Sequence, residues 1–261
     1  LVTFEPHPRS VITPDLRIPL LTTVEEKVRF ISESGIDEML VVEFTKEFAK
    51  QSPEEFIKNY LGEKVGFSKI IVGYDHKFGK GRGGDAETLK KLGIEIGFEV
   101  EVVPGYSVEG SVVSSTLIRK SLQEGRIQRA NAYLDHHYMI MGKLRSGNIE
   151  LIERNIQTLY IEIEEECKLV PPDGVYAVRI EADGESFKAI LNIKNSRYGD
   201  DRRKEDICIE IYPFSNHNSL GGKDATVYFA KYIRNEIKFA ETDELKKQLE
   251  RDKSMVEEMI Y

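Results

Sequence analysis

Cysteine is scarce in this sequence, and the two that it contains, Cys167 and Cys208, lie far apart with no Cys-x-x-Cys spacing. This pattern excludes a framework of disulfides and a cysteine-based zinc site, and it is typical of a protein that works in a reducing cytoplasm. Long apolar runs are lacking too. None approaches the roughly 18 residues that a membrane-spanning helix needs, so we expect no contact with a membrane interior.

Positive charge is also in the minority. The 261 residues include 37 Lys and Arg against 45 Asp and Glu, which gives a net charge of -8. Such an acidic chain does not offer a general surface for nucleic acids or anionic membranes, although a local basic pocket for a nucleotide is compatible with it. Repeats and low-complexity linkers are absent, and the length suits two ordinary globular domains.

The chain opens with Leu1 instead of Met, and Leu1 already stands in a strand-like run that continues to Phe4. We therefore expect that a segment upstream of Leu1 belongs to the protein.

The first half alternates between strand-like and helix-like segments up to about residue 125. The predicted strands are 1–4, 39–44, 69–72 and 98–103, and the predicted helices are 24–34, 52–60, 86–92 and 117–123. This alternation predicts a parallel sheet covered by helices. Ligands in such folds bind beyond the carboxyl ends of the strands, so the loops at 5–9, 73–85 and 110–119 are expected to open on one edge and to share a site.

Three hydroxyl residues, Ser114, Ser115 and Thr116, stand at the expected start of the helix that ends near Gly125, with Arg119 one turn further. A helix N-terminus presents unpaired N–H groups, so this pattern suits a phosphate. It suits an ordinary Ser/Thr helix cap equally well. The pattern alone leaves both interpretations open.

The loop at 73–85 contains five glycines together with charges of both signs: Asp75, Lys77, Lys80, Arg82 and Asp85. Glycines let backbone amides approach a ligand, the cations suit a phosphate, and the carboxylates suit a metal or a ribose. Loops of this kind are often only surface turns. Phe78 either packs under a planar ring or anchors the loop, and His7, which lies between two prolines, is more typical of a rigid turn than of a catalytic base.

Beyond about His137 the pattern changes to short alternating runs separated by turns. They cover 138–144, 157–163, 174–181, 187–193, 207–214 and 225–232, and a helical pattern follows over 243–259. The runs predict an antiparallel sheet or barrel. The tyrosines at 176, 198, 212, 228 and 232 are expected in its core and rim. The predicted domains are therefore 1–136 and 137–261.

Several segments, taken together, resemble one family. They are 2–8 (Val-Thr-Phe-Glu-Pro-His-Pro), 72–85 (the glycine-rich loop), 113–119 (Val-Ser-Ser-Thr-Leu-Ile-Arg), 172–178 (Pro-Asp-Gly-Val-Tyr-Ala-Val) and 233–239 (Ile-Arg-Asn-Glu-Ile-Lys-Phe). Their order and spacing are similar to those of the bacterial bifunctional riboflavin kinase/FAD synthetases, and the resemblance covers nearly the whole chain.

The resemblance implies a Rossmann-like α/β nucleotidyltransferase domain followed by an antiparallel riboflavin-kinase barrel with a C-terminal helix. The first domain would transfer AMP from ATP to FMN in the cytoplasm, with Mg²⁺, and release pyrophosphate. The implied partners are the small molecules ATP and FMN, with riboflavin as a third substrate if the kinase half is active. By motif match, the residues that would bind the ATP phosphates are Ser114, Ser115, Thr116 and Arg119. Those that would line the flavin and nucleotide cleft are Phe4, Pro6, Pro8, Asp75, Lys77, Phe78 and Gly79.

One departure from the family lies at the start. The family's phosphate-binding His-x-Gly-His motif precedes the Thr-Phe-Glu-Pro-His-Pro strand. A protein that truly began at Leu1 is therefore expected to be almost inactive as a synthetase.

A second departure lies in the kinase half. The family's Gly-Phe-Pro-Thr-Ala-Asn segment, whose Thr and Asn serve Mg²⁺ and ATP, falls on 155–160, where Thr158 remains but Tyr160 replaces the Asn. A phenol is a poor substitute for an amide oxygen at a hard cation. The family's Gly-x-Arg-Pro-Thr segment is replaced by 194–198, while Glu210 keeps the position of the kinase base. We therefore expect a kinase-inactive barrel. The alternatives are a fully bifunctional enzyme and a flavin- or nucleotide-binding pseudoenzyme.

Overall fold

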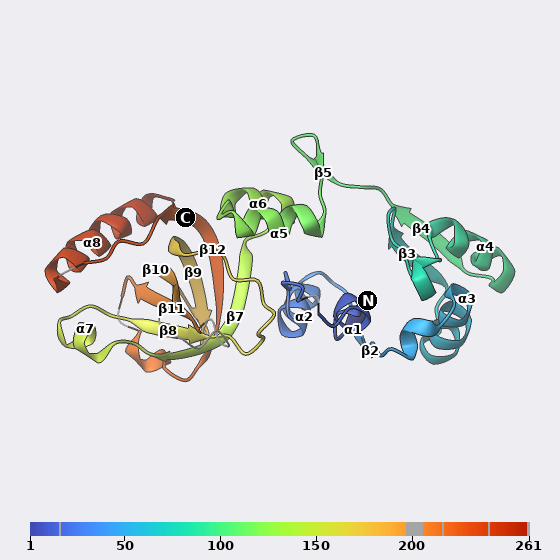
Figure 1. Ribbon diagram of the computed structural model, residues 1–261, viewed down its shortest axis with the longest axis horizontal. Coiled ribbons are helices and arrows are strands. Elements are labelled where there is room, and N and C mark those ends of the chain that lie inside the picture. The colour runs from blue at the N-terminus through green and yellow to red at the C-terminus, as the bar shows by residue number, and fades with distance from the viewer. Residues whose placement is uncertain (16, 197–205, 216, 240, 260–261) are drawn as a thin grey trace. The chain divides into compact units, whose positions relative to one another are not determined.

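The computed structural model describes residues 1–15, 17–196, 206–215, 217–239 and 241–259, with its elements labelled in Figure 1. The chain divides into two compact units. The first comprises Leu1–Ile18 and Ile31–Val113, and the second comprises Pro19–Phe30 and Ser114–Tyr261. A short segment of the first half thus belongs to the second unit. The boundary that the sequence predicts at 136/137 stays a prediction.

The first unit is built on parallel strand pairs. β1 (Val2–Glu5) lies parallel to β2 (Leu40–Glu43), and β3 (Lys69–Gly73) lies parallel to β4 (Glu99–Val103). This parallel pairing is the one predicted from the alternation of strands and helices, but the four strands form two two-stranded sheets. A small antiparallel hairpin, β5 (Ser107–Val108) with β6 (Ser111–Val112), precedes the serine-rich stretch.

Helical segments pack around these strands: α1 (Pro8–Ile12), η1 (Phe48–Lys50), α3 (Pro53–Glu55), the π-helix η2 (Phe56–Val65), η3 (Lys80–Arg82) and α4 (Ala86–Ile96). Ser52 and Glu55 form a capping box in which each side chain accepts from the other residue's backbone N–H, as their spacing predicts. The core of the unit gathers Ile57 of η2, Leu89 and Leu92 of α4, and Phe98.

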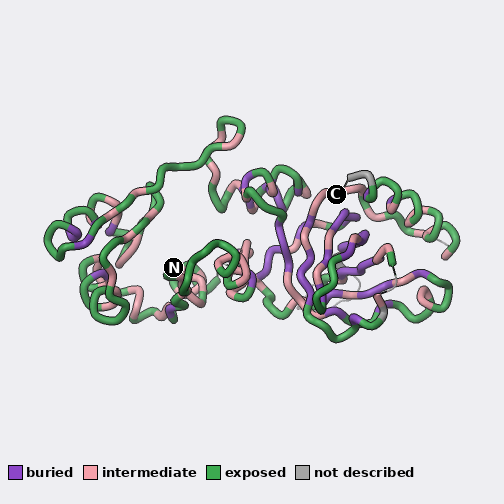
Figure 2. Tube along the Cα trace, turned by 180° about the vertical axis from the view of Figure 1, so that it is seen from behind, coloured by how far each residue is buried: buried purple, intermediate pink, exposed green. Residues whose placement is uncertain are grey.

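The second unit is dominated by a closed six-stranded antiparallel barrel with the strand order β10-β11-β8-β7-β12-β9. The strands are β7 (Tyr138–Ser146), β8 (Leu159–Glu162), β9 (Gly174–Ala182), β10 (Glu185–Ser196), β11 (Asp206–Pro213) and β12 (Asp224–Arg234). All six correspond to the alternating runs of the sequence. Closure places one face of every strand in the interior, which is why burial concentrates on these strands in Figure 2.

Aromatic rings fill the barrel beside its aliphatic residues. Tyr138, Tyr176 and Phe229 are fully buried, and the Tyr176 ring meets the Phe229 ring edge-on with centroids 5.5 Å apart. Tyr212 is also buried, in agreement with the core placement expected for the tyrosines. Tyr198, also expected in the core or rim, lies outside the described residues.

Helices surround the barrel: α5 (Ser115–Gln123), α6 (Ile127–Leu134), α7 (Ile149–Glu153), η4 (Asn218–Leu220) and the C-terminal α8 (Thr242–Met259). The sequence predicts α5 and α8 but not α6 or α7. Asn131 fastens α6, because its side chain donates to the Phe229 carbonyl and accepts from the Tyr138 N–H, both at 2.8 Å. The Arg234 guanidinium holds α8 through the fully buried Asp252 carboxylate at 2.6 Å.

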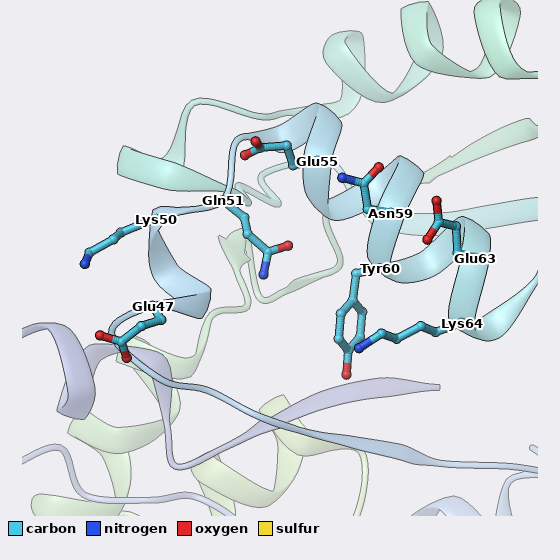
Figure 3. Close-up of a pocket in the computed structure, with 8 residues that line it drawn as sticks. All are labelled: Glu47, Lys50, Gln51, Glu55, Asn59, Tyr60, Glu63 and Lys64. Carbon is cyan, nitrogen blue, oxygen red and sulfur yellow. The ribbon is translucent and has the colours of Figure 1, made fainter.

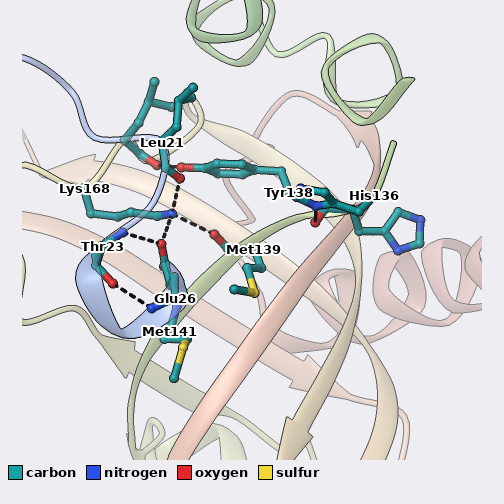
Figure 4. Close-up of polar contacts among 10 residues, drawn as sticks. Leu21, Thr23, Glu26, His136, Tyr138, Met139, Met141 and Lys168 are labelled. Carbon is teal, nitrogen blue, oxygen red and sulfur yellow. Dashed lines mark hydrogen bonds and ion pairs between the residues drawn. The ribbon is translucent and has the colours of Figure 1, made fainter. Parts of the chain in front are cut away.

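The segment Pro19–Phe30, which carries the start of α2 (Val24–Glu33), is pinned to the barrel by a buried ion pair. The Lys168 ammonium donates to Glu26 Oε2 at 2.6 Å and to the carbonyls of Leu21 and Met139 at 2.8 Å (Figure 4). The other Glu26 oxygen accepts from the Met141 N–H at 3.0 Å. Both side chains are completely buried. The amphipathic pattern of α2 predicts a helix, and these contacts show that the helix face bearing Glu26 packs against the barrel.

Burial disfavours the charged form of Lys168, and the ion pair with Glu26 counteracts this effect. Burial lowers the pKa of Lys168 to about 8, and the neighbouring Glu26 carboxylate acts in the opposite direction. Since every N–H of the ammonium has an acceptor, the lysine stays charged at neutral pH and its hydrogen bonds tie three separate segments together.

Replacement of Lys168 by Met should lower the free energy of unfolding of the barrel by about 3–5 kcal/mol, because it leaves the Glu26 carboxylate buried without its partner. Urea unfolding followed by near-ultraviolet circular dichroism measures this, since the buried tyrosines lie in the barrel. Lys223→Met is the matched control, because Lys223 forms a solvent-exposed pair with Asp183 at 3.0 Å. Equal effects of the two substitutions would contradict the role given to the buried pair.

Candidate functional site

An aromatic cluster in the first unit joins two of the motifs that the sequence singles out. Phe4 of β1 lies 6.2 Å from Phe56 of η2, and Phe56 lies 6.2 Å from Phe78 of the glycine-rich loop, measured between ring centroids. Phe44 and Phe48 extend the cluster beside Phe4 at 5.5 and 5.8 Å. Its rings are only partly buried. Two predicted site residues that lie 74 positions apart in sequence (78 − 4) therefore border one aromatic surface.

The two ends of the glycine-rich loop are joined by backbone hydrogen bonds and an ion pair. Phe78 and Gly84 exchange backbone hydrogen bonds at 3.0 and 2.9 Å, and the Lys77 ammonium contacts the Asp85 carboxylate at 3.0 Å. Asp85 also caps α4 by accepting from the Thr88 N–H and hydroxyl. These contacts, led by the Thr88 N–H, hold the pKa of Asp85 below its usual range. Asp75 and Lys77 are exposed, so they border the loop's outer surface.

Glycine is required at two positions of this loop for steric reasons. A Cβ on Gly84 would lie 2.7 Å from the Phe78 ring, and a Cβ on Gly79 would lie 2.8 Å from Pro53. Gly79 also has a φ of 70°, in the left-handed region. The loop places the Phe78 ring beside Phe56 of η2. Whether this ring also packs under a bound planar ring stays a prediction.

The segment after β1 is compact. The Glu5–Pro6 peptide is cis, Pro8 is the first residue of α1, and the His7 ring nitrogen Nδ1 accepts from the Arg9 N–H at 3.2 Å. His7 thus has the turn role expected for it.

The serine-rich stretch forms the start of α5 in the second unit. The Ser114 hydroxyl accepts from the Leu117 N–H at 3.3 Å, which is the helix cap that the sequence allows. Ser115 and Thr116 are exposed on the first turn. Arg119 donates from Nε to the Pro19 carbonyl at 2.7 Å, so it also helps to hold the 19–30 segment. A role of these four residues at a phosphate stays a prediction, as does the meeting of their loop with the two loops of the first unit.

A cavity of about 560 Å³ lies between η1 and η2, beside the aromatic cluster (Figure 3). It is lined by Glu47, Lys50, Gln51, Glu55, Asn59, Tyr60, Glu63 and Lys64. The Tyr60 ring contributes to the aromatic cluster at 5.1 Å from Phe48, and the Lys64 ammonium lies 4.7 Å from the Tyr60 ring centroid. The sequence analysis did not predict this cavity. The signal that could have indicated it is the close spacing of the aromatics Phe44, Phe48, Phe56 and Tyr60.

In the barrel, Glu210 of β11 is buried among hydroxyl groups and one cation. The Tyr212 hydroxyl donates to Glu210 Oε2 at 2.7 Å, and Tyr160 of β8 lies directly opposite Glu210 in the antiparallel register. Lys194 of β10 lies 3.6 Å from Glu210 Oε2. Burial, together with the Glu210 charge, raises the pKa of Tyr160 to about 12, so that phenol stays neutral.

Thr158 is not available as a metal ligand. It is completely buried, and its hydroxyl accepts from the Asn148 N–H at 2.8 Å. Gly147 lies so close that a Cβ there would be 1.9 Å from the Thr158 hydroxyl. Within the described part of the chain, no three His, Cys, Asp or Glu side chains are grouped to hold a metal ion. The barrel residues therefore do not fit Mg²⁺ as they stand.

Two family models match the chain in series: FAD synthetase over residues 1–117 and riboflavin kinase over 134–260. A bifunctional riboflavin kinase/FMN adenylyltransferase of Listeria monocytogenes is 32% identical over 255 residues, which span 97% of this chain and 79% of that protein. Proteins of the same name from Escherichia coli K12 and Bacillus subtilis are 31% and 30% identical, over 100% and 97% of this chain and 82% and 79% of theirs. The chain belongs to the bifunctional riboflavin kinase/FMN adenylyltransferase family.

A solved structure described as a macrolide-efflux protein from Streptococcus pneumoniae is also similar. It has a TM-score of 0.86 and 25% identity over 98% of this chain and 82% of its own. This likeness concerns the fold. Among the helices of the described residues, none has the length and apolar character of a membrane span.

Within the family's synthetase half, Gly84→Ala should displace the Phe78 ring and weaken FMN binding, because the new methyl group has no room beside that ring. We expect a cost of about 1–3 kcal/mol in stability and a lower affinity for FMN. Quenching of flavin fluorescence measures the affinity. Gly62→Ala on η2 is the control, since its Cβ would meet only the Ile57 carbonyl at an ordinary 3.4 Å. Unaltered FMN affinity in Gly84→Ala would remove Phe78 from the flavin site.

Proposed function

We propose that this protein transfers the adenylyl group of ATP to FMN and that its barrel has lost riboflavin kinase activity. An oxygen of the FMN phosphate attacks the α-phosphorus of ATP, the bond to the β-phosphate breaks, and pyrophosphate leaves. No covalent intermediate with the protein is needed, so the side chains act by position and charge. The proposal agrees with the FAD synthetase match over the first 117 residues.

The aromatic cluster around Phe56 carries the flavin part of the proposal. An isoalloxazine ring is planar and largely apolar, and partly buried rings that border a cavity are a suitable surface for it. Phe4 and Phe78, which flank Phe56, would provide this surface. By motif match, Pro6, Pro8, Gly79 and the exposed Asp75 and Lys77 would line the cleft next to it.

In this proposal, the start of α5 binds the nucleotide. Ser115, Thr116 and Arg119 would bind the ATP phosphates, with Ser114 fixing the first turn through its cap. The N–H groups of this turn and the Arg119 guanidinium provide positive potential for them. Mg²⁺ would enter bound to the phosphates of ATP, as part of the substrate.

Three features of the barrel favour the loss of kinase activity. The Thr158 hydroxyl is engaged by the Asn148 N–H, a phenol at Tyr160 stands where the family has an amide, and residues 194–198 replace the family's Gly-x-Arg-Pro-Thr segment. Glu210 keeps the position of a base, but its carboxylate is surrounded by two phenols and an ammonium. A general base needs a substrate held within its reach. The two phenols and the ammonium around Glu210 are not the oxygen ligands that a metal-bound phosphate needs.

The barrel nevertheless retains a place for a ligand. A cavity of about 270 Å³ lies between the end of β11 and α8, with Tyr212, Phe214 and Leu249 among its lining residues. The side-chain oxygen of Gln157, on the same cavity, is buried and has no hydrogen-bond partner among the described residues. A flavin that stays unphosphorylated is a suitable occupant.

Incubation of the full-length protein with ATP and Mg²⁺ tests both parts when the flavins are separated by chromatography. With FMN we expect FAD, and with riboflavin we expect riboflavin unchanged, because the barrel lacks the phosphate and metal ligands. FAD formed from riboflavin would show a fully bifunctional enzyme and contradict the loss of kinase activity. No product from either flavin would show a binding protein without catalysis and contradict the synthetase proposal.

A further inference from the structure

A lysine lies between two carboxylates on the face of the β10–β11 ladder that also carries Ile190 and Tyr212. The Lys194 ammonium lies 3.6 Å from Glu210 Oε2 and 3.4 Å from Glu236 Oε1, which follows β12. Neither distance is that of a strong hydrogen bond, so the ammonium acts mainly as a positive charge shared by two carboxylates.

The groups around this charge have the chemistry of a hard-cation site. Asn192 lies directly opposite Glu210 in the antiparallel register, so both side chains project from the same face of the sheet. Asn192 is 8% exposed, and its Oδ1 atom has no hydrogen-bond partner among the described residues. Two carboxylates and an amide oxygen from three parts of the fold are the ligand types that Mg²⁺, Mn²⁺ and lanthanide ions take.

We propose that the Lys194 ammonium takes the place of a divalent cation in the barrel, and that removal of this side chain opens a metal site formed by Glu210, Glu236 and Asn192. A buried carboxylate such as Glu210 needs a compensating charge, and Lys194 supplies it from within the chain. The inference rests on the proposed loss of kinase function and deepens it, because it names the group that lies beside the Glu210 carboxylate in place of a metal ion.

The substitution is structurally feasible. The Lys194 side chain is 38% exposed, whereas Glu210 is 7% exposed at its side chain, so the lysine stem reaches in from the surface instead of filling the core. The Tyr212 hydroxyl remains on Glu210 when the lysine is truncated. Lys194→Ala should therefore fold, and Lys194→Met keeps the apolar stem if the truncation proves too severe.

Binding of Tb³⁺ and Mn²⁺ without any nucleotide or flavin tests the proposal. Tyrosine-sensitised Tb³⁺ luminescence reports an ion beside Tyr160 and Tyr212, and Mn²⁺ competes for the same site. We expect Lys194→Ala to bind Mn²⁺ at least about tenfold more tightly than the unmodified protein, because one positive charge has left a site with two carboxylates. Lys194→Arg, which keeps the positive charge, is the matched control and should not gain affinity. Addition of Glu210→Gln to Lys194→Ala should abolish the gain.

Equal Mn²⁺ affinity in the unmodified protein and in Lys194→Ala would overturn the proposal, and so would a gain that survives Glu210→Gln. The failure of this inference is separate from that of the proposed function, since the metal assay contains no substrate. Phosphorylation of riboflavin by the unmodified protein would refute the loss of kinase activity, whereas a Lys194→Ala variant without new metal affinity would refute only the role of Lys194.

Discussion

The buried Glu26–Lys168 pair is the interaction on which the second unit depends. Isolated charges inside a protein are costly. This pair is tolerated because all three N–H groups of the ammonium have acceptors and both carboxylate oxygens have donors. Its effect is organisational. It ties residues 19–30, which precede most of the first unit in sequence, to β7 and to the segment before β9. The Arg119 side chain holds the same segment through the Pro19 carbonyl, so the helix proposed to bind ATP phosphates and the barrel share one anchored element.

The barrel combines an apolar core with a small group of charged and polar side chains around Glu210. The closed strand order and the aromatic core depend on apolar packing. Glu210 is buried, and its neighbours are the Lys194 ammonium and the phenols of Tyr212 and Tyr160. If the proposed loss of kinase activity holds, the barrel still has a structural role, because it anchors residues 19–30 within its own unit.

Much of the fold follows from local patterns in the sequence. The six alternating runs predict the six barrel strands because period-two alternation survives closure, and the Ser52–Glu55 and Thr23–Glu26 spacings predict helix starts that the hydrogen bonds confirm. The assignment of 19–30 to the barrel unit could not be predicted, since it depends on a lysine 142 positions away from Glu26. The helices α6 and α7 were missed because they are short, with 8 and 5 residues, which leaves few turns in which a helical period can be recognised.

The candidate site was predictable in its motifs but not in its contacts. The sequence identifies Phe4, Phe78 and the glycine-rich loop, yet only the structure shows that Phe56 joins the two rings and that Gly84 must lack a side chain. Likewise, the replacement of an Asn by Tyr160 is visible in the sequence, whereas the position of Lys194 between two carboxylates is a property of the barrel register.

Phosphorus-31 NMR of the protein with Mg²⁺, ATP and each flavin in turn tests the central claim most directly, because adenylyl transfer releases pyrophosphate whereas a kinase releases ADP. The account predicts growth of the pyrophosphate signal with FMN and no ADP above the flavin-free control with riboflavin. Flavin-dependent ADP formation with riboflavin, or no pyrophosphate with FMN, would contradict it.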